Sequence, residues 1–335
     1  AAILARAGAR KAEAATVARY LVRADLVGHS SHGVLRVPTY AQQVKDGDIK
    51  PGVTGKVIAE GRGHLVLDAD WGWGQVVTER AMKKGIAKAK RAGTAIVAIR
   101  NVAHVGRLGD WAEQAAAAGC VALCFVNTPT RPAQAPFGGR ERRLSTNPLC
   151  CAFPGGKTGP VLIDLTTSAV AEGKVKLAHA AGKSIPLGWI VDKHGKPSTD
   201  PGAFYAGGAL LPIAAHKGYA LATMVDLFAG ALSGGPTSNK TTSAMFNNFT
   251  AILISPDAIG TGKEYRAQVK RLETWLRSAT PSDRKAPVLL PGDVERAMET
   301  ERRRKGIPIA DGVVEELYKA ADAYGPGRKK VAALL

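Results

Sequence analysis

A histidine stands where the chain changes from an apolar run to a helical one. His104 lies in the stretch Asn101 to Gly109, after the β-branched run Thr94 to Ile99 and before the alanine-rich sequence that begins at Asp110. This order predicts a strand, a loop that holds His104, and a helix. Since imidazole titrates near neutrality and strand-end loops often carry sites, His104 is a candidate acid/base for a hydroxyl group. The alternative is a loop histidine that caps the following helix.

A second candidate group combines an imidazole, a guanidinium and a phenol. His32, Arg36 and Tyr40 follow a crowd of glycine, serine and histidine and enter a stretch that we expect to be helical despite Pro38. A helix would place Arg36 and Tyr40, four residues apart, on one face with His32. Such a face suits a carboxylate, because the guanidinium fork matches its two oxygens. An amphipathic helix whose arginine meets solvent is the alternative, and the spacing does not decide between them.

Three later stretches are rich in hydroxyls, backbone donors and lysines. They are Ser145 to Pro148, Asp164 to Lys174, and His216 to Leu221. Such residues suit a phosphate or a ribose, and the third stretch opens a helix that we expect to run to Leu232, with free amides beside Lys217. Each alone also fits ordinary capping and turn chemistry, but three in one region favour a nucleotide. No Gly-x-Gly-x-x-Gly stands in a βαβ context, and no Walker-type loop is present.

The elements around these residues predict an α/β protein of two parts. Helical and apolar stretches alternate as far as Thr128, which predicts layered α/β structure. After Pro129 the short β-branched runs predict a separate, mainly antiparallel sheet. We expect a first domain of residues 1–116, completed by 266–335, and a second of residues 117–265. A helix should start at Asp293, after the break at Pro291.

Length and composition agree with this organisation. A chain of 335 residues, 45% of them hydrophobic, can bury a core for about two domains. Its apolar runs are too short for a membrane span and its first residues carry no cleavage-site pattern, so we expect a cytoplasmic protein without a membrane partner. The four cysteines lie in or beside apolar runs, with no second cluster of cysteine or histidine. We therefore expect free thiols and no metal site.

The charge balance raises a different class of function. A formal charge of +18 permits nucleic acid or anionic metabolites as partners. The Lys and Arg residues are scattered, however, and the densest run, Arg302 to Lys305, follows directly on Glu301, as on a solvated helix face. A basic nucleic-acid-binding protein would also interleave aromatic residues, which make up only 6% of the chain. We keep that function as an alternative and expect no nucleic acid.

The motifs, taken in order, resemble the malate/L-lactate dehydrogenase type 2 family, which also includes sulfolactate and ureidoglycolate dehydrogenases and reductases of cyclic imino acids. The similarity runs through nearly the whole chain. It is carried by Ser31-His32-Gly33 with Arg36, Asn101 to Gly106, Asn147-Pro148, Asp164 to Lys174, Ile185 to Trp189, Thr199 to Pro201, His216 to Tyr219, and Pro291-Gly292.

The resemblance implies an oxidoreductase that uses NAD or NADP and is usually a homodimer. It implies that residues 117–265 form a cofactor domain without a Rossmann fold and that residues 1–116 serve substrate binding and dimerisation. On the matching positions His104 would be the acid/base, and His32, Arg36 and Tyr40 would hold the substrate. Cofactor contacts would come from Thr128, Asn147, Asp164, Thr166, Lys174, His216, Lys217 and Gly218.

The expected reaction is reversible hydride transfer between nicotinamide and C2 of a small L-2-hydroxy acid such as malate or lactate, without a metal. A reductase of a cyclic imino acid is the nearer alternative, and the sequence does not separate the two. Two departures from the family pattern touch the cofactor side. Ser145 stands where many relatives have glycine, and Ala214-Ala215 replaces a common glycine pair before His216.

Overall fold

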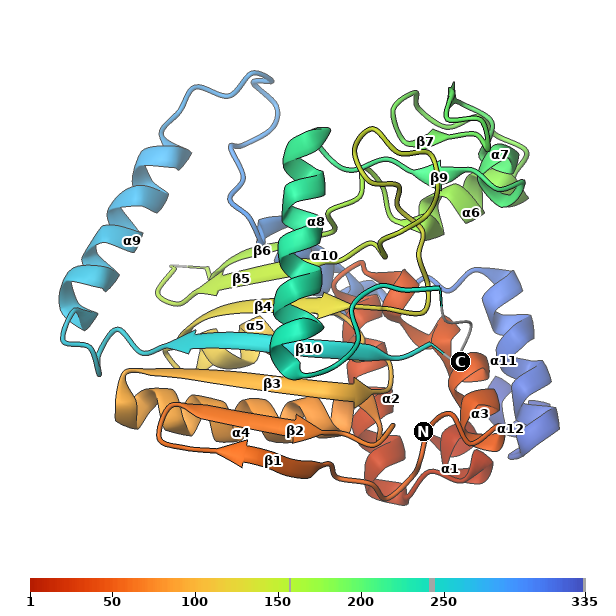
Figure 1. Ribbon diagram of the computed structural model, residues 1–335, viewed down its shortest axis with the longest axis horizontal. Coiled ribbons are helices and arrows are strands. Elements are labelled where there is room, and N and C mark those ends of the chain that lie inside the picture. Colours follow the sequence, from red (N-terminus) through yellow and green to blue (C-terminus); the bar gives the residue numbers. More distant parts are fainter. Residues whose placement is uncertain (157, 241–244, 334–335) are drawn as a thin grey trace.

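The computed structural model describes residues 1–156, 158–240 and 245–333, and a seven-stranded sheet forms its centre (Figure 1). In spatial order the strands are β1 (Lys56–Glu60), β2 (His64–Asp68), β3 (Thr94–Val102), β10 (Asn247–Ile254), β4 (Val121–Asn127), β5 (Leu149–Phe153) and β6 (Val161–Leu165). β2 and β3 run parallel, and the other neighbours pair antiparallel.

β10 occupies the middle of this sheet although it comes last in sequence. Its Ala251 lies opposite Val97 of β3 and Cys124 of β4. The predicted α/β class and the antiparallel character of the second half are confirmed. Because β10 and β4 to β6 extend the sheet that residues 1–116 begin, the strands of the two halves form one continuous sheet. The division into domains at these bounds stays a prediction.

Helices cover both faces of the sheet (Figure 1). α4 (Gly74–Ala92) and α5 (Gly109–Ala117) pack on one face, and α8 (His216–Ala229) on the other. Met82 of α4 and Trp111 of α5 join Phe249 and Leu253 of β10 in the largest buried cluster. Each such side chain contributes roughly 1.5–3 kcal/mol through burial. α8 was expected to reach Leu232 but ends at Ala229. A 3₁₀ turn, η3 (Ala231–Ser233), follows it.

The two ends of the chain form a helical layer beside the sheet. α1 (Ala2–Ala7), α2 (Lys11–Leu26) and α3 (Val37–Lys45) come from the first residues, and α11 (Asp311–Tyr324) and α12 (Arg328–Ala332) from the last. Leu4 and Tyr40 share a buried cluster with Leu317 and Val331. α10 (Asp293–Lys305) starts at the predicted residue and packs on α2.

The stretch with the second candidate group is only partly α-helical. α3 starts at Val37 with Pro38 in its first turn, where a missing N–H leaves no helical bond unmade. His32 and Arg36 precede it in two 3₁₀ turns, η1 (Ser30–His32) and η2 (Val34–Arg36). The expectation that one helical face carries all three residues was therefore wrong in detail. The turns and α3 still direct His32 and Tyr40 to a common neighbour, His104.

A smaller layer stands above one end of the main sheet (Figure 1). It holds a three-stranded sheet, in the order β8 (Pro197–Ser198), β7 (Ile190–Val191) and β9 (Ala209–Leu210), with α6 (Glu172–Ala180) and α7 (Pro201–Tyr205). α9 (Gly262–Arg277) stands at the opposite edge of the molecule.

The fold bears on the thiols, on membrane spans and on metal sites. All four cysteines are free, as expected, and only Cys151 is partly exposed. In residues 1–156, 158–240 and 245–333, no helix combines the length and apolarity that a membrane crossing requires. In the same ranges, no three residues of the His, Cys, Asp and Glu types gather as a metal site would need.

Candidate functional site

His104 lies in the predicted loop, between the end of β3 at Val102 and the start of α5 at Gly109. The phenol oxygen of Tyr40, from α3, is 2.6 Å from Nδ1 of His104. The ring of His32 stacks on the ring of His104, with centroids 5.4 Å apart and planes inclined by 18°. The fold thus brings together the two candidate groups that are about 70 positions apart in sequence.

Arg36 adds an uncompensated positive charge to this group. Its Nε donates a 2.7 Å hydrogen bond to the backbone oxygen of Ser31, which fixes one edge of the guanidinium. Among the described residues, no acidic side chain forms an ion pair with it. A planar guanidinium held in this way suits a bound carboxylate, which would supply the missing counter-charge.

Burial sets the protonation of the three ring side chains. It lowers the pKa of His104 well below 6.5, and the charge of Arg36 lowers it further. It also lowers the pKa of His32, to about 3, with Arg36 acting in the same direction. Burial raises the pKa of the Tyr40 phenol. At neutral pH both imidazoles are therefore neutral and the phenol keeps its proton, so His104 is able to accept a proton.

Two buried asparagines that the sequence reasoning missed hold the His104 loop. Asn247 accepts a 3.0 Å hydrogen bond from the backbone N–H of Val105, and its Nδ2 donates to Oγ1 of Thr128 at 2.9 Å. Asn248 accepts one of 3.1 Å from the backbone N–H of Asn101. The start of β10 therefore connects the loop to the end of β4. The pair of amides just before an apolar run was the available signal.

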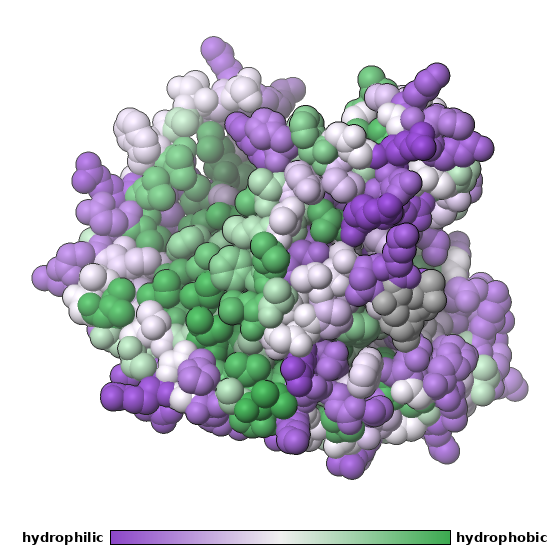
Figure 2. Space-filling view, viewed as in Figure 1, coloured by the Kyte–Doolittle hydropathy of each residue, from purple (hydrophilic) through white to green (hydrophobic). Residues whose placement is uncertain are grey.

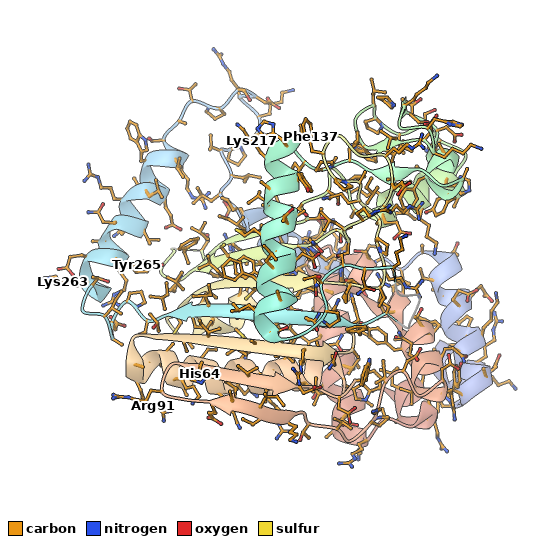
Figure 3. All side chains as sticks on the ribbon, in the orientation of Figure 1. His64, Arg91, Phe137, Lys217, Lys263 and Tyr265 are labelled. Atoms are coloured by element: carbon orange, nitrogen blue, oxygen red, sulfur yellow. The ribbon has the colours of Figure 1, made fainter. Side chains whose placement is uncertain are left out.

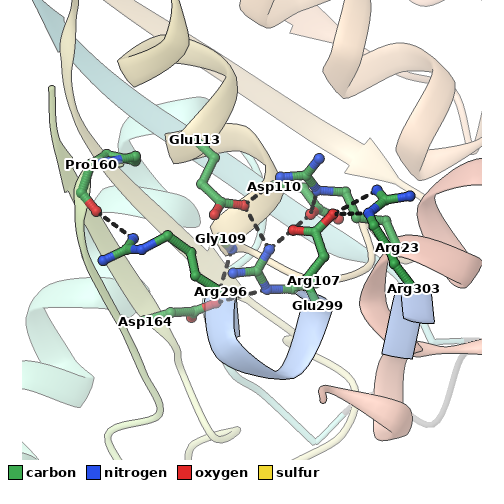
Figure 4. A network of polar contacts seen from close by, with 10 residues as sticks. All are labelled: Arg23, Arg107, Gly109, Asp110, Glu113, Pro160, Asp164, Arg296, Glu299 and Arg303. Carbon is green, nitrogen blue, oxygen red and sulfur yellow. Dashed lines mark hydrogen bonds and ion pairs between the residues drawn. The ribbon is translucent and has the colours of Figure 1, made fainter. Parts of the chain in front are cut away.

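A buried ionic network lies next to the loop (Figure 4). Nη1 of Arg107 donates to Asp110 at 3.0 Å and to Glu113 at 2.7 Å, and Arg23 binds the same two carboxylates. Burial raises the pKa of Asp110 to about 6 despite both guanidinium groups. Glu113 is more exposed, and there the two arginines outweigh burial and lower its pKa. The spacing of three residues from 107 to 110 to 113 was the sequence signal for this network.

Two of the predicted cofactor residues direct their side chains into the protein. Asp164 accepts a 2.9 Å hydrogen bond from the backbone N–H of Gly109, at the start of α5, and lies 3.8 Å from Nε of Arg107. Asn147 is fully buried; its Nδ2 donates to the backbone oxygen of Ala222 at 2.8 Å, and its Oδ1 accepts from the Ser145 hydroxyl. Asp164 thus supports α5, and Asn147 supports α8.

Thr166 lies near the start of α8, where His216, Lys217 and Gly218 stand. Oγ1 of Thr166 donates to the backbone oxygen of Thr146 and lies 2.8 Å from the Ser168 hydroxyl. Ser168 forms a bridge with Pro212, only a few residues before α8 begins at His216. The hydroxyl-rich stretch and the first turn of α8 therefore lie close together.

The first turn of α8 has the features of an anion site. Lys217 is exposed, and the ring of the preceding residue, His216, meets that of Phe137 edge to face at 5.8 Å (Figure 3). Gly218 allows a close approach, because a Cβ there would lie 1.9 Å from the backbone oxygen of Ile213. A helix start with an exposed lysine and adjacent hydroxyls fits the phosphates of a dinucleotide.

Lys174 lies on a helix whose start approaches the substrate candidates. It is exposed in the first turn of α6. A Cβ built on the preceding Gly173 would be 3.7 Å from Cβ of Ser31, next to His32. The start of α6 therefore approaches the substrate candidates.

Comparison with known proteins gives consistent results. A family model described as malate/L-lactate dehydrogenase matches residues 1–318. The chain is 39% identical to hydroxycarboxylate dehydrogenase B of Escherichia coli (strain K12) over 97% of this chain and 91% of that protein. It is 33% identical to ureidoglycolate dehydrogenase (NAD(+)) of the same strain over 95% and 92%. The structure of delta1-piperideine-2-carboxylate reductase from Pseudomonas syringae superposes with a TM-score of 0.86, at 32% identity, over 95% of this chain and 96% of that one.

Proposed function

The chain belongs to the malate/L-lactate dehydrogenase family, and on that premise we propose that it oxidises a small L-2-hydroxy acid such as malate or lactate reversibly to the 2-oxo acid. The observation that carries the proposal is a neutral, half-buried His104 in contact with Tyr40 and close to Arg36, which has no acidic partner among the described residues.

In this proposal Arg36 binds the substrate carboxylate and orients the hydroxyl at C2. The hydrogen bond from Nε of Arg36 to the backbone oxygen of Ser31 already holds the guanidinium in place, so the side chain loses little freedom when substrate binds. The negative charge of the bound carboxylate also offsets the positive field that lowers the pKa of His104. Substrate binding therefore makes His104 a stronger base at the moment when it is needed.

His104 exchanges the proton. Its Nδ1 is engaged by Tyr40, which leaves Nε2 to face the reacting oxygen. In oxidation Nε2 accepts the hydroxyl proton as hydride leaves C2; in reduction the imidazolium returns that proton to the carbonyl oxygen. Such proton transfer typically contributes about 10²- to 10⁴-fold to the rate.

The cofactor, NAD or NADP, supplies the hydride-acceptor and hydride-donor chemistry when it is bound. We propose that residues 117–265 hold it, with Lys217, His216 and Gly218 at the start of α8 and Thr166 beside them. Thr128 and Lys174 complete the contacts on the side of the substrate. Asp164 and Asn147 act through the elements that they hold in place.

A second candidate reaction is reduction of a cyclic imino acid. The similarity to the piperideine-2-carboxylate reductase favours it, and the same Arg36 would bind the carboxylate of such a substrate. His104 would then donate its proton to a nitrogen rather than to an oxygen. The two reactions differ in substrate and share the protein groups.

We also propose that the protein is a cytoplasmic homodimer. Figure 2 shows an apolar surface that extends over α8 and towards α9. Leu227 of α8 is 54% exposed and Trp275 of α9 is 74% exposed, and large exposed apolar surfaces often mark protein–protein contacts. Free cysteines agree with a reducing compartment. Sedimentation of the parent and of Trp275→Glu tests the dimer, which the variant should weaken.

The test of the function combines a substrate screen with one variant. Malate, lactate, their 2-oxo acids and cyclic imino acids are assayed with both nicotinamide cofactors, in parent protein and in His104→Ala. We expect turnover of a 2-hydroxy acid and a loss of about 100-fold or more in the variant, with cofactor binding nearly unchanged. Equal turnover in both proteins would remove His104 from the reaction.

A further inference from the structure

Gln75 is a buried amide that touches the catalytic group from a third direction. It is the second residue of α4 and fully buried. Its Nε2 donates a 3.3 Å hydrogen bond to the Tyr40 hydroxyl, and its Oε1 is buried without a partner in the described part of the chain. A Cβ on Gly106, in the His104 loop, would lie 3.1 Å from Nε2 of Gln75. The backbone of the His104 loop therefore passes close to this amide at Gly106, where a larger residue would crowd it.

The proposed reaction requires a particular tautomer of His104. A neutral imidazole that accepts a proton on Nε2 must carry its own proton on Nδ1, and the imidazolium carries a proton there as well. In both states Nδ1 donates to the Tyr40 oxygen. The Tyr40 hydroxyl then needs another acceptor for its own hydrogen, because it cannot donate to an Nδ1 that already bears one.

Gln75 is the side chain in position to be that acceptor. Tyr40 is 1% exposed, so solvent does not reach its hydroxyl freely. Rotation of the Gln75 amide by half a turn exchanges its oxygen and nitrogen, which have nearly the same shape. Oε1 then faces the Tyr40 hydroxyl and accepts from it. In the opposite orientation Nε2 donates to Tyr40, Tyr40 donates to Nδ1, and the His104 proton moves to Nε2, where it blocks the base.

We propose that Gln75 is a positioning residue which, through Tyr40, selects the tautomer of His104 that can act as a base. The inference rests on the proposed function, since it assigns a direction to the proton transfer at that same site. It assigns Gln75 no contact with substrate or cofactor. The role resembles that of any group that orients a catalytic imidazole from behind.

The pKa of His104 depends on the charged and titratable groups that face it. They are Arg36 from η2, His32 from η1, Tyr40 from α3 and, through Tyr40, Gln75 from α4. Arg36 carries a fixed charge and burial keeps His32 neutral above about pH 3. A shift seen on changing Gln75 alone is therefore attributable to the chain from Gln75 to His104.

Three variants test the inference. Gln75→Met keeps the size and removes the acceptor, and Gln75→Glu supplies a carboxylate that accepts without needing to rotate. Gln114→Met is the matched control, because Nε2 of Gln114 also donates one 3.3 Å hydrogen bond, to the backbone oxygen of Glu79, and its Oε1 is also buried without a partner. Gln114 lies on α5, and among the described residues it forms no hydrogen bond with Tyr40.

In kinetics, Gln75→Met should lower kcat for 2-hydroxy acid oxidation about tenfold, the equivalent of one hydrogen bond, and leave KM nearly unchanged. Gln75→Glu should keep most of kcat and move the acidic limb of the pH profile of kcat/KM upward, because a buried carboxylate favours the imidazolium. Gln114→Met should match the parent. Equal losses in both Gln75 variants with an unmoved profile would overturn the positioning role.

Nitrogen NMR of protein labelled with ¹⁵N-histidine gives a readout that does not depend on turnover. The His104 signals, identified by their absence in His104→Ala, should show a proton on Nδ1 in the parent and on Nε2 in Gln75→Met. If the tautomer changes in this way but neither the parent nor any variant shows activity, the proposed function is contradicted and the role of Gln75 stands. The same tautomer in parent and Gln75→Met would overturn the role of Gln75, whatever the activity.

Discussion

Asn247 accepts a 3.0 Å hydrogen bond from the backbone N–H of Val105, the residue that follows His104. The same side chain donates to Thr128 at the end of β4. One buried amide therefore sets the distance between the proposed acid/base loop and the proposed cofactor side. Hydride and proton transfer need both parts in fixed relation, because small misplacements are costly in rate.

The first prediction concerns this amide. Asn247→Ala leaves the buried N–H of Val105 without an acceptor, which costs about 1–3 kcal/mol of folding free energy. Turnover should fall more than thermal stability explains, because the loop loses its tie to β4. Chemical denaturation and kcat, measured on the same preparation, check it. Unchanged values of both would show that the loop is held by its other contacts.

The second prediction concerns Arg36. Arg36→Lys keeps the charge but cannot offer both edges of a planar fork, one of which is used by Ser31. KM for a carboxylate substrate should rise by the equivalent of about 1.5–3 kcal/mol, the worth of one charged hydrogen bond. Steady-state kinetics at saturating cofactor measure it, and a KM equal to that of the parent would place Arg36 outside the site.

The third prediction concerns the start of α8. Lys217→Ala should weaken nicotinamide-cofactor binding more than it raises KM for the substrate, since the exposed ammonium and the helix start face an anion together. Lys263→Ala is the matched control, because Lys263 is likewise the second residue of its helix, α9. Fluorescence titration with NADH and NADPH compares them. A larger effect on substrate than on cofactor would move Lys217 to the other side of the site.

The fourth prediction concerns Ala215, just before α8. Its φ of 55° and ψ of −123° belong to a region that suits glycine, and such backbone strain costs on the order of 1–3 kcal/mol. Ala215→Gly should therefore raise the melting temperature. Ala220→Gly, within the same helix, should lower it by the usual helix penalty of about 1 kcal/mol. Calorimetry on both variants checks the pair, and destabilisation by both would mean that Ala215 is not strained.

The fifth prediction concerns pH and His32. Burial holds its folded pKa near 3, below the 6.5 of an exposed imidazole, so the unfolded chain binds a proton that the folded chain does not. Stability from this group is complete above pH 6.5 and is lost as pH falls towards 3. The loss is about 2 kcal/mol by pH 5. Denaturation of parent and His32→Asn at pH 7 and pH 5 should show a smaller decrease in the variant. Equal decreases would contradict the neutral state of His32 in the folded protein.

Local patterns predicted what depends on local sequence. The apolar run before His104 and the alanines after it defined the strand, loop and helix, and Asp293 marked the start of α10. Arg36 and Tyr40 were proposed as site residues from residue type and spacing, and their roles stay predictions. The meeting of Tyr40 with His104 could not be read from spacing, because tertiary packing of α3 against the loop that follows β3 creates it.

The sequence reasoning also missed residues whose chemistry is ordinary until they are buried. Asn247, Gln75 and Arg107 are polar side chains with at most a weak sequence signal, and their burial in or beside the loop gives them importance. Asp164 and Asn147 show the converse, since their motif was recognised but their side chains turn towards α5 and α8. Which way a polar side chain turns is decided by the donors that the fold places around it.

The position of β10 has a consequence for how the chain folds during synthesis. β3 and β4 are close in sequence but do not pair, because β10, made of residues 247–254, separates them. Closing the sheet therefore requires contacts across about 150 residues, which slows folding and leaves two strand edges unpaired until then. Since Asn247 arrives with the same strand, a ribosome-bound chain that stops short of β10 has neither a closed sheet nor a fastened His104 loop.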